Sequence, residues 1–108
     1  MPVWSDWRDT VRFGDAEPEV TVLHESLELK VVLVGLRAGQ SLPEHPGPAA
    51  VFHFLDGAAV MTVDAEQIEV TTGATVVVPP GGVRGVRAVT DVAFLGSLGD
   101  PAAEDTPG

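Results

Sequence analysis

Two side chains, His45 and Arg84, are the strongest candidates for chemistry in this sequence. His45 ends the stretch Ser-Leu-Pro-Glu-His, and Arg84 follows the turn-forming run Pro-Pro-Gly-Gly-Val. An imidazole can act as a general base or as a metal ligand. A guanidinium binds carboxylate or phosphate through two parallel hydrogen bonds. Together the two side chains would form a cationic pocket, which predicts binding of a small organic ligand and favours one with an acidic group.

Three apolar residues, Phe52, Phe54 and Met61, would supply the walls of this ligand-binding pocket. Aromatic and thioether side chains commonly line small-molecule sites. The simpler interpretation is that all three pack in the core, because large apolar side chains are usually buried. The sequence therefore predicts either an open pocket or a filled interior at these positions.

The polar pair also has simpler interpretations. An arginine after a Pro-Gly-Gly turn is often solvated, or paired with a surface carboxylate, here Glu44 or Asp56. A single histidine such as His45 can be a core residue that hydrogen-bonds a backbone carbonyl. Both interpretations remain open beside that of a ligand site.

Short valine-rich runs separated by Gly and Pro must position these residues. Their composition and their spacing of about 8–12 residues are typical of an antiparallel β-sandwich or β-barrel. Asp56-Gly57 is a tight-turn dipeptide between two apolar runs and predicts a hairpin. The expected strands are residues 20–24, 27–36, 51–55, 59–64, 67–70, 75–78, 83–89 and 92–98.

The length of 108 residues suits one domain. We expect an N-terminal arm over residues 1–18, a barrel over residues 19–98 and a flexible tail over residues 99–108. The arm holds both tryptophans, Trp4 and Trp7, and such large side chains rarely remain in solvent. We therefore expect the arm to pack on the barrel or on a partner subunit.

Two motifs of fixed spacing each begin with a glycine. The motif residues are Gly39, His45 and Gly57 in the first motif, and Gly73, Pro79, Gly81 and Arg84 in the second. Five residues separate the leading glycine from the histidine in the first motif, and five separate it from the proline in the second. These patterns resemble the two motifs of the cupin superfamily, and the resemblance spans roughly residues 6–97.

The resemblance implies an all-β single domain, an antiparallel double-stranded β-helix of the RmlC-like jelly-roll type. It also implies a metal site, because cupins typically hold a divalent ion with three histidines and one glutamate. The matched positions here are His45, Gly47, Ala50 and Arg84. A catalytic metal generally needs about three protein ligands, and an arginine repels a dication. We therefore expect degenerate metal motifs and no cofactor, with a divalent metal at His45 as the alternative.

Other polar residues could rebuild a metal site only by facing the barrel interior. Side chains alternate along a strand, so His53 faces outward if Ala50 faces inward. His53 would then be an outer-face or interface histidine. Glu44 would face away from its neighbour His45, and His24 lies in a strand before the first motif.

The chain has 16 acidic and 6 basic residues, for a net charge of −10. Such a surface repels nucleic-acid phosphates and anionic lipids, so we expect neither nucleic acid nor membrane as a partner. The chain has no cysteine, which excludes disulfides and thiolate metal sites. We expect a cytoplasmic protein. The resemblance implies a homodimer, because small cupins usually pair.

Three functions remain open. The first is a metal-free cupin that binds a small organic ligand in its barrel. The second is a small-molecule enzyme, metal-dependent or metal-free, of the isomerase or epimerase kind, in which His45 is the base and Arg84 stabilises negative charge. The third is a structural dimeric domain whose barrel is filled by its own side chains. An open barrel would favour the first two, and a filled barrel would favour the third.

Overall fold

The computed structural model describes residues 1–101, so most of the tail expected over residues 99–108 lies outside the described residues. None of the helical structure in residues 1–101 is long and apolar enough to cross a bilayer. The described chain holds one short 3₁₀ helix, η1 (Trp7–Asp9), followed by strands β1 (Glu19–Glu25), β2 (Lys30–Leu36), β3 (Ser41–His45), β4 (Ala50–Asp56), β5 (Ala58–Val63), β6 (Glu66–Thr71), β7 (Thr75–Val78), β8 (Arg84–Ala88) and β9 (Val92–Leu98).

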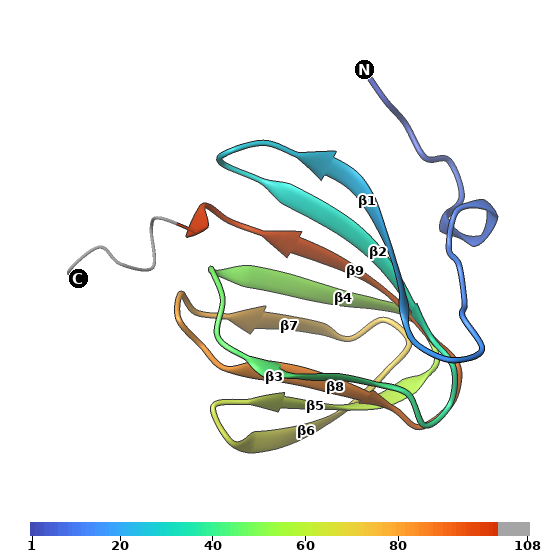
Figure 1. Cartoon of the computed structure of the whole chain (residues 1–108), viewed down its shortest axis with the longest axis vertical. Coiled ribbons are helices and arrows are strands. Elements are labelled where there is room, and N and C mark those ends of the chain that lie inside the picture. The colour runs from blue at the N-terminus through green and yellow to red at the C-terminus, as the bar shows by residue number, and fades with distance from the viewer. Residues whose placement is uncertain (102–108) are drawn as a thin grey trace.

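The strands form two antiparallel sheets that face each other across the core (Figure 1). The five-stranded sheet has the order β1-β2-β9-β4-β7, and the four-stranded sheet has the order β3-β8-β5-β6. Several neighbouring strands are far apart in the sequence, as where β9 lies between β2 and β4. This topology confirms the all-β jelly-roll fold predicted from the sequence.

The core lies between the two sheets and contains side chains from alternate strand positions. β4 buries Ala50, Phe52 and Phe54 on its inner face, while the residues between them are more exposed. The rings of Phe52 and Phe54 each lie 5.4 Å from the ring of Phe94 in β9, in tilted arrangements that aromatic pairs prefer. Valines fill much of the remaining space, because β-branched side chains suit a pleated, half-buried surface.

The connection at Asp56-Gly57 corrects one prediction. β4 and β5 belong to different sheets, so the predicted hairpin is wrong. Gly57 turns the chain between sheets with a φ of +97°, and a side chain there would collide with the carbonyl oxygen of Asp91. A two-residue hairpin turn instead joins β5 to β6, where Asp64 and Ala65 both have positive φ.

Strand β3 forms in a segment that was not among the expected strands. It contains a proline and one half-buried side chain, that of Leu42, so its hydrophobic pattern is weak. β3 lies at the edge of the four-stranded sheet, where proline is tolerated. Its register with β8 shifts between Leu42 and His45, and the shift places His45, rather than Glu44, opposite Arg84.

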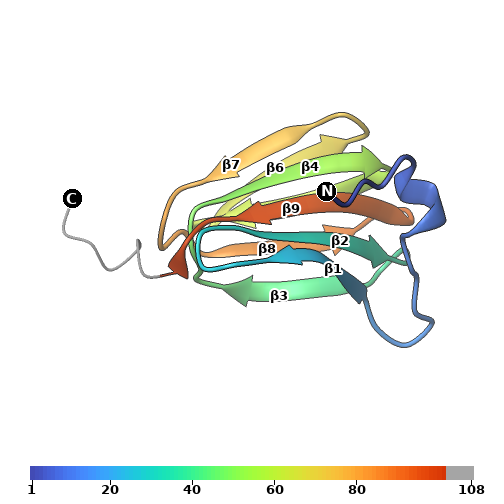
Figure 2. The ribbon, with the colours of Figure 1, turned by 90° about the horizontal axis from the view of Figure 1, so that it is seen from above.

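The N-terminal arm lies over the outer face of the five-stranded sheet, as Figure 2 shows. Asp6 caps η1 by accepting a hydrogen bond from the backbone N–H of Arg8. Farther along, the backbone of Arg12 passes directly over Gly35 of β2. Leu33 on this outer face is therefore buried, with 1% of its surface exposed. The arm thus packs on the barrel of its own chain.

Candidate functional site

Arg84 points into one end of the barrel, where its guanidinium is bonded to backbone carbonyls. Arg84 is the first residue of β8 and lies on the same inner face of that strand as Val86 and Ala88. Only 2% of Arg84 is exposed. Its Nε donates to the carbonyl oxygen of Gly82 at 2.8 Å. Its Nη2 donates to the carbonyl oxygens of Gly47 at 3.1 Å and Pro48 at 2.7 Å. The side chain therefore fastens the β3–β4 loop to the β7–β8 loop.

The placement of Arg84 in solvent is wrong, because 2% of the residue is exposed. Its pairing with a surface carboxylate such as Glu44 or Asp56 stays a prediction. The direction of the side chain follows from strand alternation, because Arg84 occupies an inward position of β8. Gly47 makes room for it, since a Cβ at that position would lie 3.2 Å from Nη1. A histidine at position 47 would therefore compete with the guanidinium for the same space.

His45 lies at the rim of the barrel and is exposed. The β3–β8 register pairs it with Arg84. Its Nδ1 lies 3.0 Å from the carbonyl oxygen of Pro43, so a backbone carbonyl is its partner as the sequence predicts. The prediction of a core histidine is wrong, because β3 ends at this residue on an open edge.

Phe52, Phe54 and Met61 lie in the packed core, with exposed fractions of 7%, 0% and 0%. They belong to the same buried cluster as Val78 and Val86. The structure thus brings the three apolar candidates together inside the barrel and leaves His45 outside at the rim. Their role in binding a ligand stays a prediction.

The other two histidines lie on the outer face of the five-stranded sheet. Ala50 faces inward, and His53 faces outward as the alternation predicts, with its Nδ1 2.8 Å from the Thr75 hydroxyl oxygen. His24 follows a bulge in β1, and its Nε2 lies 3.2 Å from the Ser26 hydroxyl oxygen. Neither histidine faces the barrel interior.

The residues at the family's metal-ligand positions do not fit a divalent ion. His45 supplies one imidazole, Gly47 and Ala50 supply no side-chain donor, and the cationic Arg84 fills the space near them. Within residues 1–101, no three His, Asp or Glu side chains gather closely enough to hold a metal ion. A dication at this place would face a permanent positive charge with about one of the three protein ligands it generally needs.

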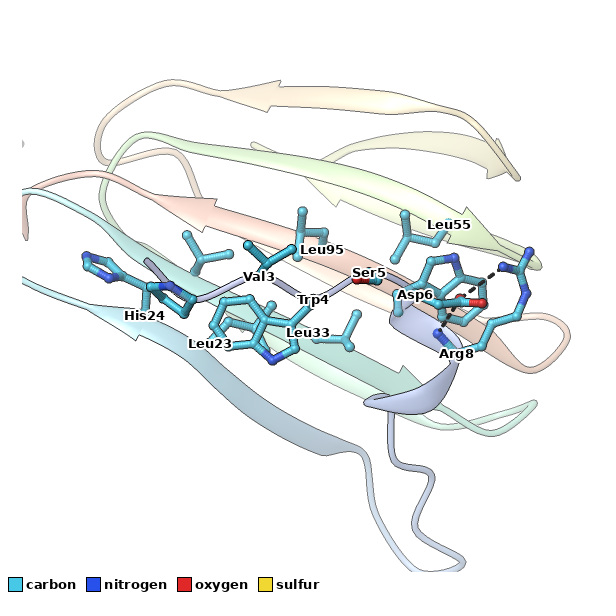
Figure 3. A pocket seen from close by; sticks show the side chains of 13 residues that line it. Val3, Trp4, Ser5, Asp6, Arg8, Leu23, His24, Leu33, Leu55 and Leu95 are labelled. Carbon is cyan, nitrogen blue, oxygen red and sulfur yellow. Dashed lines mark hydrogen bonds and ion pairs between the residues drawn. The ribbon is translucent and has the colours of Figure 1, made fainter.

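A cleft that the sequence does not predict lies between the N-terminal arm and the five-stranded sheet (Figure 3). The cleft has a volume of about 590 Å³. Its apolar lining includes Trp4 from the arm and Leu23, Leu33, Leu55 and Leu95 from the sheet. The pair of tryptophans near the N-terminus was the available signal, but packing voids leave no pattern in a sequence.

Two exposed carboxylates have lowered pKa values. The backbone N–H of Arg8, followed by its guanidinium, holds the pKa of Asp6 below its ordinary value of 3.8. The backbone N–H of Ala38, followed by the Arg37 guanidinium, does the same for the pKa of Asp91. Hydrogen bonds to the charged form favour that form in both cases. Asp6 lies at the new cleft, and Asp91 fastens the β2–β3 connection to the start of β9.

Comparison with known proteins relates the chain to one family. The profile of the family described as Cupin domain matches residues 23–95. An RmlC-like cupin protein from Desulfovibrio desulfuricans is 31% identical, with a TM-score of 0.83 over 94% of this chain and 98% of that one. A conserved protein of unknown function from Streptococcus pyogenes is 25% identical, with a TM-score of 0.84 over 94% of this chain and 90% of that one.

A more distant structure shows the same fold. An uncharacterized protein with a double-stranded β-helix domain from Klebsiella pneumoniae is 19% identical, with a TM-score of 0.85 over 95% of this chain and 94% of that one. No curated protein matches the sequence. The family profile and the Desulfovibrio likeness each cover most of the chain. The chain therefore belongs to the cupin family, as a small single-domain RmlC-like member.

Proposed function

We propose that this cupin works without the divalent metal typical of its family, and that its barrel is a packed scaffold rather than a reaction chamber. The observation that carries the proposal is the placement of Arg84, which is 2% exposed and bonded to three backbone carbonyls at the matched metal position. In this proposal the guanidinium replaces the metal as the group that holds the two loops together.

The packing of the barrel supports the same proposal. Phe54 and Met61 have no exposed surface, and Phe52 and Phe94 stack against the same core. Protein interiors of this kind are packed at the density of organic crystals, so a substrate would have to displace side chains to enter. A filled interior favours the third of the functions left open by the sequence, a structural or interaction domain.

Metal content of the purified protein tests the proposal. We expect far less than one equivalent of any transition metal by elemental analysis, and no thermal stabilisation by Ni, Mn, Zn or Fe salts. The triple variant G47H/A50E/R84H should acquire metal affinity that the parent lacks, because it adds three donor side chains to that of His45. A stoichiometric metal in the parent that is lost in His45→Ala would overturn the proposal.

The scaffolding role of Arg84 has a matched control on the same strand. Arg84→Met removes the donor for three carbonyls, and we expect the free energy of unfolding to fall by about 2–4 kcal/mol. Arg87 is exposed on the opposite side of β8, so Arg87→Met should change it by less than about 0.5 kcal/mol. Equal stability of the two variants in urea denaturation would contradict the role assigned to Arg84.

Binding of a small organic anion at the barrel mouth is the second candidate function. The observation that favours it is the register, which places His45 opposite Arg84 across β3 and β8. A carboxylate would take over guanidinium hydrogen bonds that backbone carbonyls now accept. We expect small mono- and dicarboxylates to raise the melting temperature of the parent but not of His45→Ala or Arg84→Met. Equal shifts in all three proteins would contradict a site at this pair.

A homodimer is part of the proposed scaffold. Val51 and Val77 are paired across β4 and β7 on the outer face, with 38% and 71% of their surfaces exposed. Leu29 nearby is 42% exposed. Apolar residues grouped in this way commonly mark protein interfaces. Size-exclusion chromatography with light scattering should give a dimer mass, and Val77→Lys should shift it toward the monomer. A parent that stays monomeric at high concentration would contradict this assembly.

A further inference from the structure

The cleft beneath the N-terminal arm has the size and shape of a small-molecule site. Its volume of about 590 Å³ lies within the range of roughly 300–1,000 Å³ that ligand pockets occupy. Leu33 and Leu95 are neighbours across β2 and β9 and form its floor, and Trp4 lies over them (Figure 3). The cleft is outside the barrel, so it does not depend on the barrel's metal status.

Polar side chains mark the two ends of the cleft (Figure 3). At one end Asp6 and Arg8 form an ion pair of 3.1 Å, and the guanidinium lies 4.8 Å from the centre of the Trp7 ring. The two charges of this pair offset each other. At the other end lies the imidazole of His24, which contacts the Ser26 hydroxyl through Nε2. A ligand would thus meet apolar walls and one imidazole able to donate or accept a hydrogen bond.

The arm can open without breaking hydrogen bonds to the sheet. Within the described chain, the backbone hydrogen bonds of residues 1–11 join the arm to itself, as from Val11 to Trp7. A fixed anchor comes later, where the side-chain amide of Gln40 donates to the carbonyl oxygen of Gly14 at 2.7 Å. Side-chain packing alone therefore holds the first residues over the cleft. Such a segment can admit a ligand and close over it.

We propose that the cleft binds a small, neutral, mainly aromatic molecule with one hydrogen-bonding group at the His24 end. The indole of Trp4 offers a flat face for ring stacking. The net charge of −10 disfavours an anion. A cation gains little, because the carboxylate of Asp6 is already paired with Arg8. A neutral ring compound would pack against the leucines, stack on the indole of Trp4 and hydrogen-bond the imidazole of His24.

Two fluorescent probes of related skeleton test this chemistry. N-phenyl-1-naphthylamine is neutral and carries one N–H group, whereas 1-anilinonaphthalene-8-sulfonate adds a negative charge. Trp4 and Trp7 are the two tryptophans of the chain, so energy transfer from tryptophan reports a bound probe, and the variants below locate it. We expect saturable binding of the neutral probe at one per chain, and binding of the sulfonate at least about tenfold weaker. Equal affinity for both probes would overturn the proposed charge preference.

Matched variants locate the probe. Val31→Phe places a ring inside the cleft and should weaken binding of the neutral probe at least about tenfold. Val20→Phe makes the same change on the other face of the same sheet, where Val20 is 51% exposed, and should leave binding unchanged. His24→Ala should weaken binding several-fold and His24→Gln should restore part of it, since an amide also donates and accepts. Unaltered binding in Val31→Phe would overturn the site.

A second copy of the chain is the rival occupant of this cleft. If the arm of a partner subunit filled it, the parent would be a dimer by light scattering and would bind no neutral probe at any concentration. That result would overturn the small-molecule site while leaving the metal-free barrel intact. Unfolding midpoints of all variants show whether lost binding reflects a lost fold. A parent-like midpoint in Val31→Phe together with lost probe binding supports the proposal.

Discussion

The inner and outer faces of the five-stranded sheet carry similar apolar residues but bury them in different ways. On the inner face, Val34, Phe52 and Phe94 pack against the opposite sheet and are 2%, 7% and 1% exposed. On the outer face, Leu33 and Leu95 lie beneath an irregular arm, and a cleft of about 590 Å³ remains beside them. The same sheet therefore has a filled face, which is tightly packed against the other sheet, and a hollow face, which borders the cleft.

The difference comes from what covers each face. A second sheet presents a regular array of side chains that interdigitate with the first, which leaves little free space. A single irregular segment offers few side chains, and two of them are rigid indoles that cannot follow the leucine surface closely. In this cupin the large apolar hollow lies on the back of the sheet. A ligand is therefore expected at this outer cleft rather than in the filled interior of the barrel.

The largest effect should come from the filled face. Phe54 has no exposed surface, and its ring lies 5.4 Å from that of Phe94 in a tilted arrangement. Phe54→Ala should lower the free energy of unfolding by about 3–5 kcal/mol, because the tightly packed surroundings cannot collapse into the cavity. Urea denaturation followed by far-ultraviolet circular dichroism measures this loss. A loss below about 1 kcal/mol would mean that the barrel interior is not tightly packed.

The hollow face should tolerate a comparable deletion better. Leu33 is 1% exposed but borders the cleft, so its removal enlarges a space that already exists. Leu33→Ala should lower the free energy of unfolding by about 2–3 kcal/mol, near the lower end of the range for buried leucines. The same urea titration gives the value. If this cost equalled that of Phe54→Ala, the contrast between the faces would disappear.

The fold could be predicted because its determinants are local or are preserved in motif spacing. Valine-rich runs gave the positions of most strands, and the glycine-led motifs indicated the jelly-roll barrel. β3 could not be predicted, because it is an edge strand with a proline and one half-buried residue. The hairpin at Asp56-Gly57 was predicted wrongly, because a turn dipeptide fixes a bend but not the sheet that the next strand joins.

The candidate site was predictable in part. The inward direction of Arg84 follows from alternation, but its carbonyl partners do not, since they depend on how two distant loops meet. The pairing of His45 with Arg84 depends on a register shift in β3, which residue types alone do not specify. The cleft was beyond prediction for a similar reason, because a void results from the misfit of two surfaces rather than from any residue.

A smaller effect should follow from a single methyl group between the arm and the sheet. A Cβ on Gly35 would collide with the carbonyl oxygen of Arg12, so Gly35→Ala must push the arm outward. We expect the free energy of unfolding to fall by about 1–3 kcal/mol. Tryptophan emission should shift to the red, and acrylamide should quench it more efficiently. Gly96→Ala is the control on the inner face, where the new Cβ would meet a methyl of Val32 at 3.2 Å. Unchanged emission in Gly35→Ala would show that the arm does not rest on this position.

The smallest effect concerns the acid stability of the arm. The backbone N–H and guanidinium of Arg8 lower the pKa of Asp6. The charged carboxylate therefore favours the capped η1 turn of the arm above pH of about 3.8, and this contribution is lost as the pH falls through the lowered pKa. Tryptophan emission should shift to the red on acidification below about pH 4, before far-ultraviolet circular dichroism reports loss of the sheets. Asp6→Asn keeps a side-chain oxygen that can cap η1, but the amide does not titrate. The early red shift of tryptophan emission should therefore be absent in this variant. An identical early shift in Asp6→Asn would assign the acid response to another group and separate the stability of the arm from this cap.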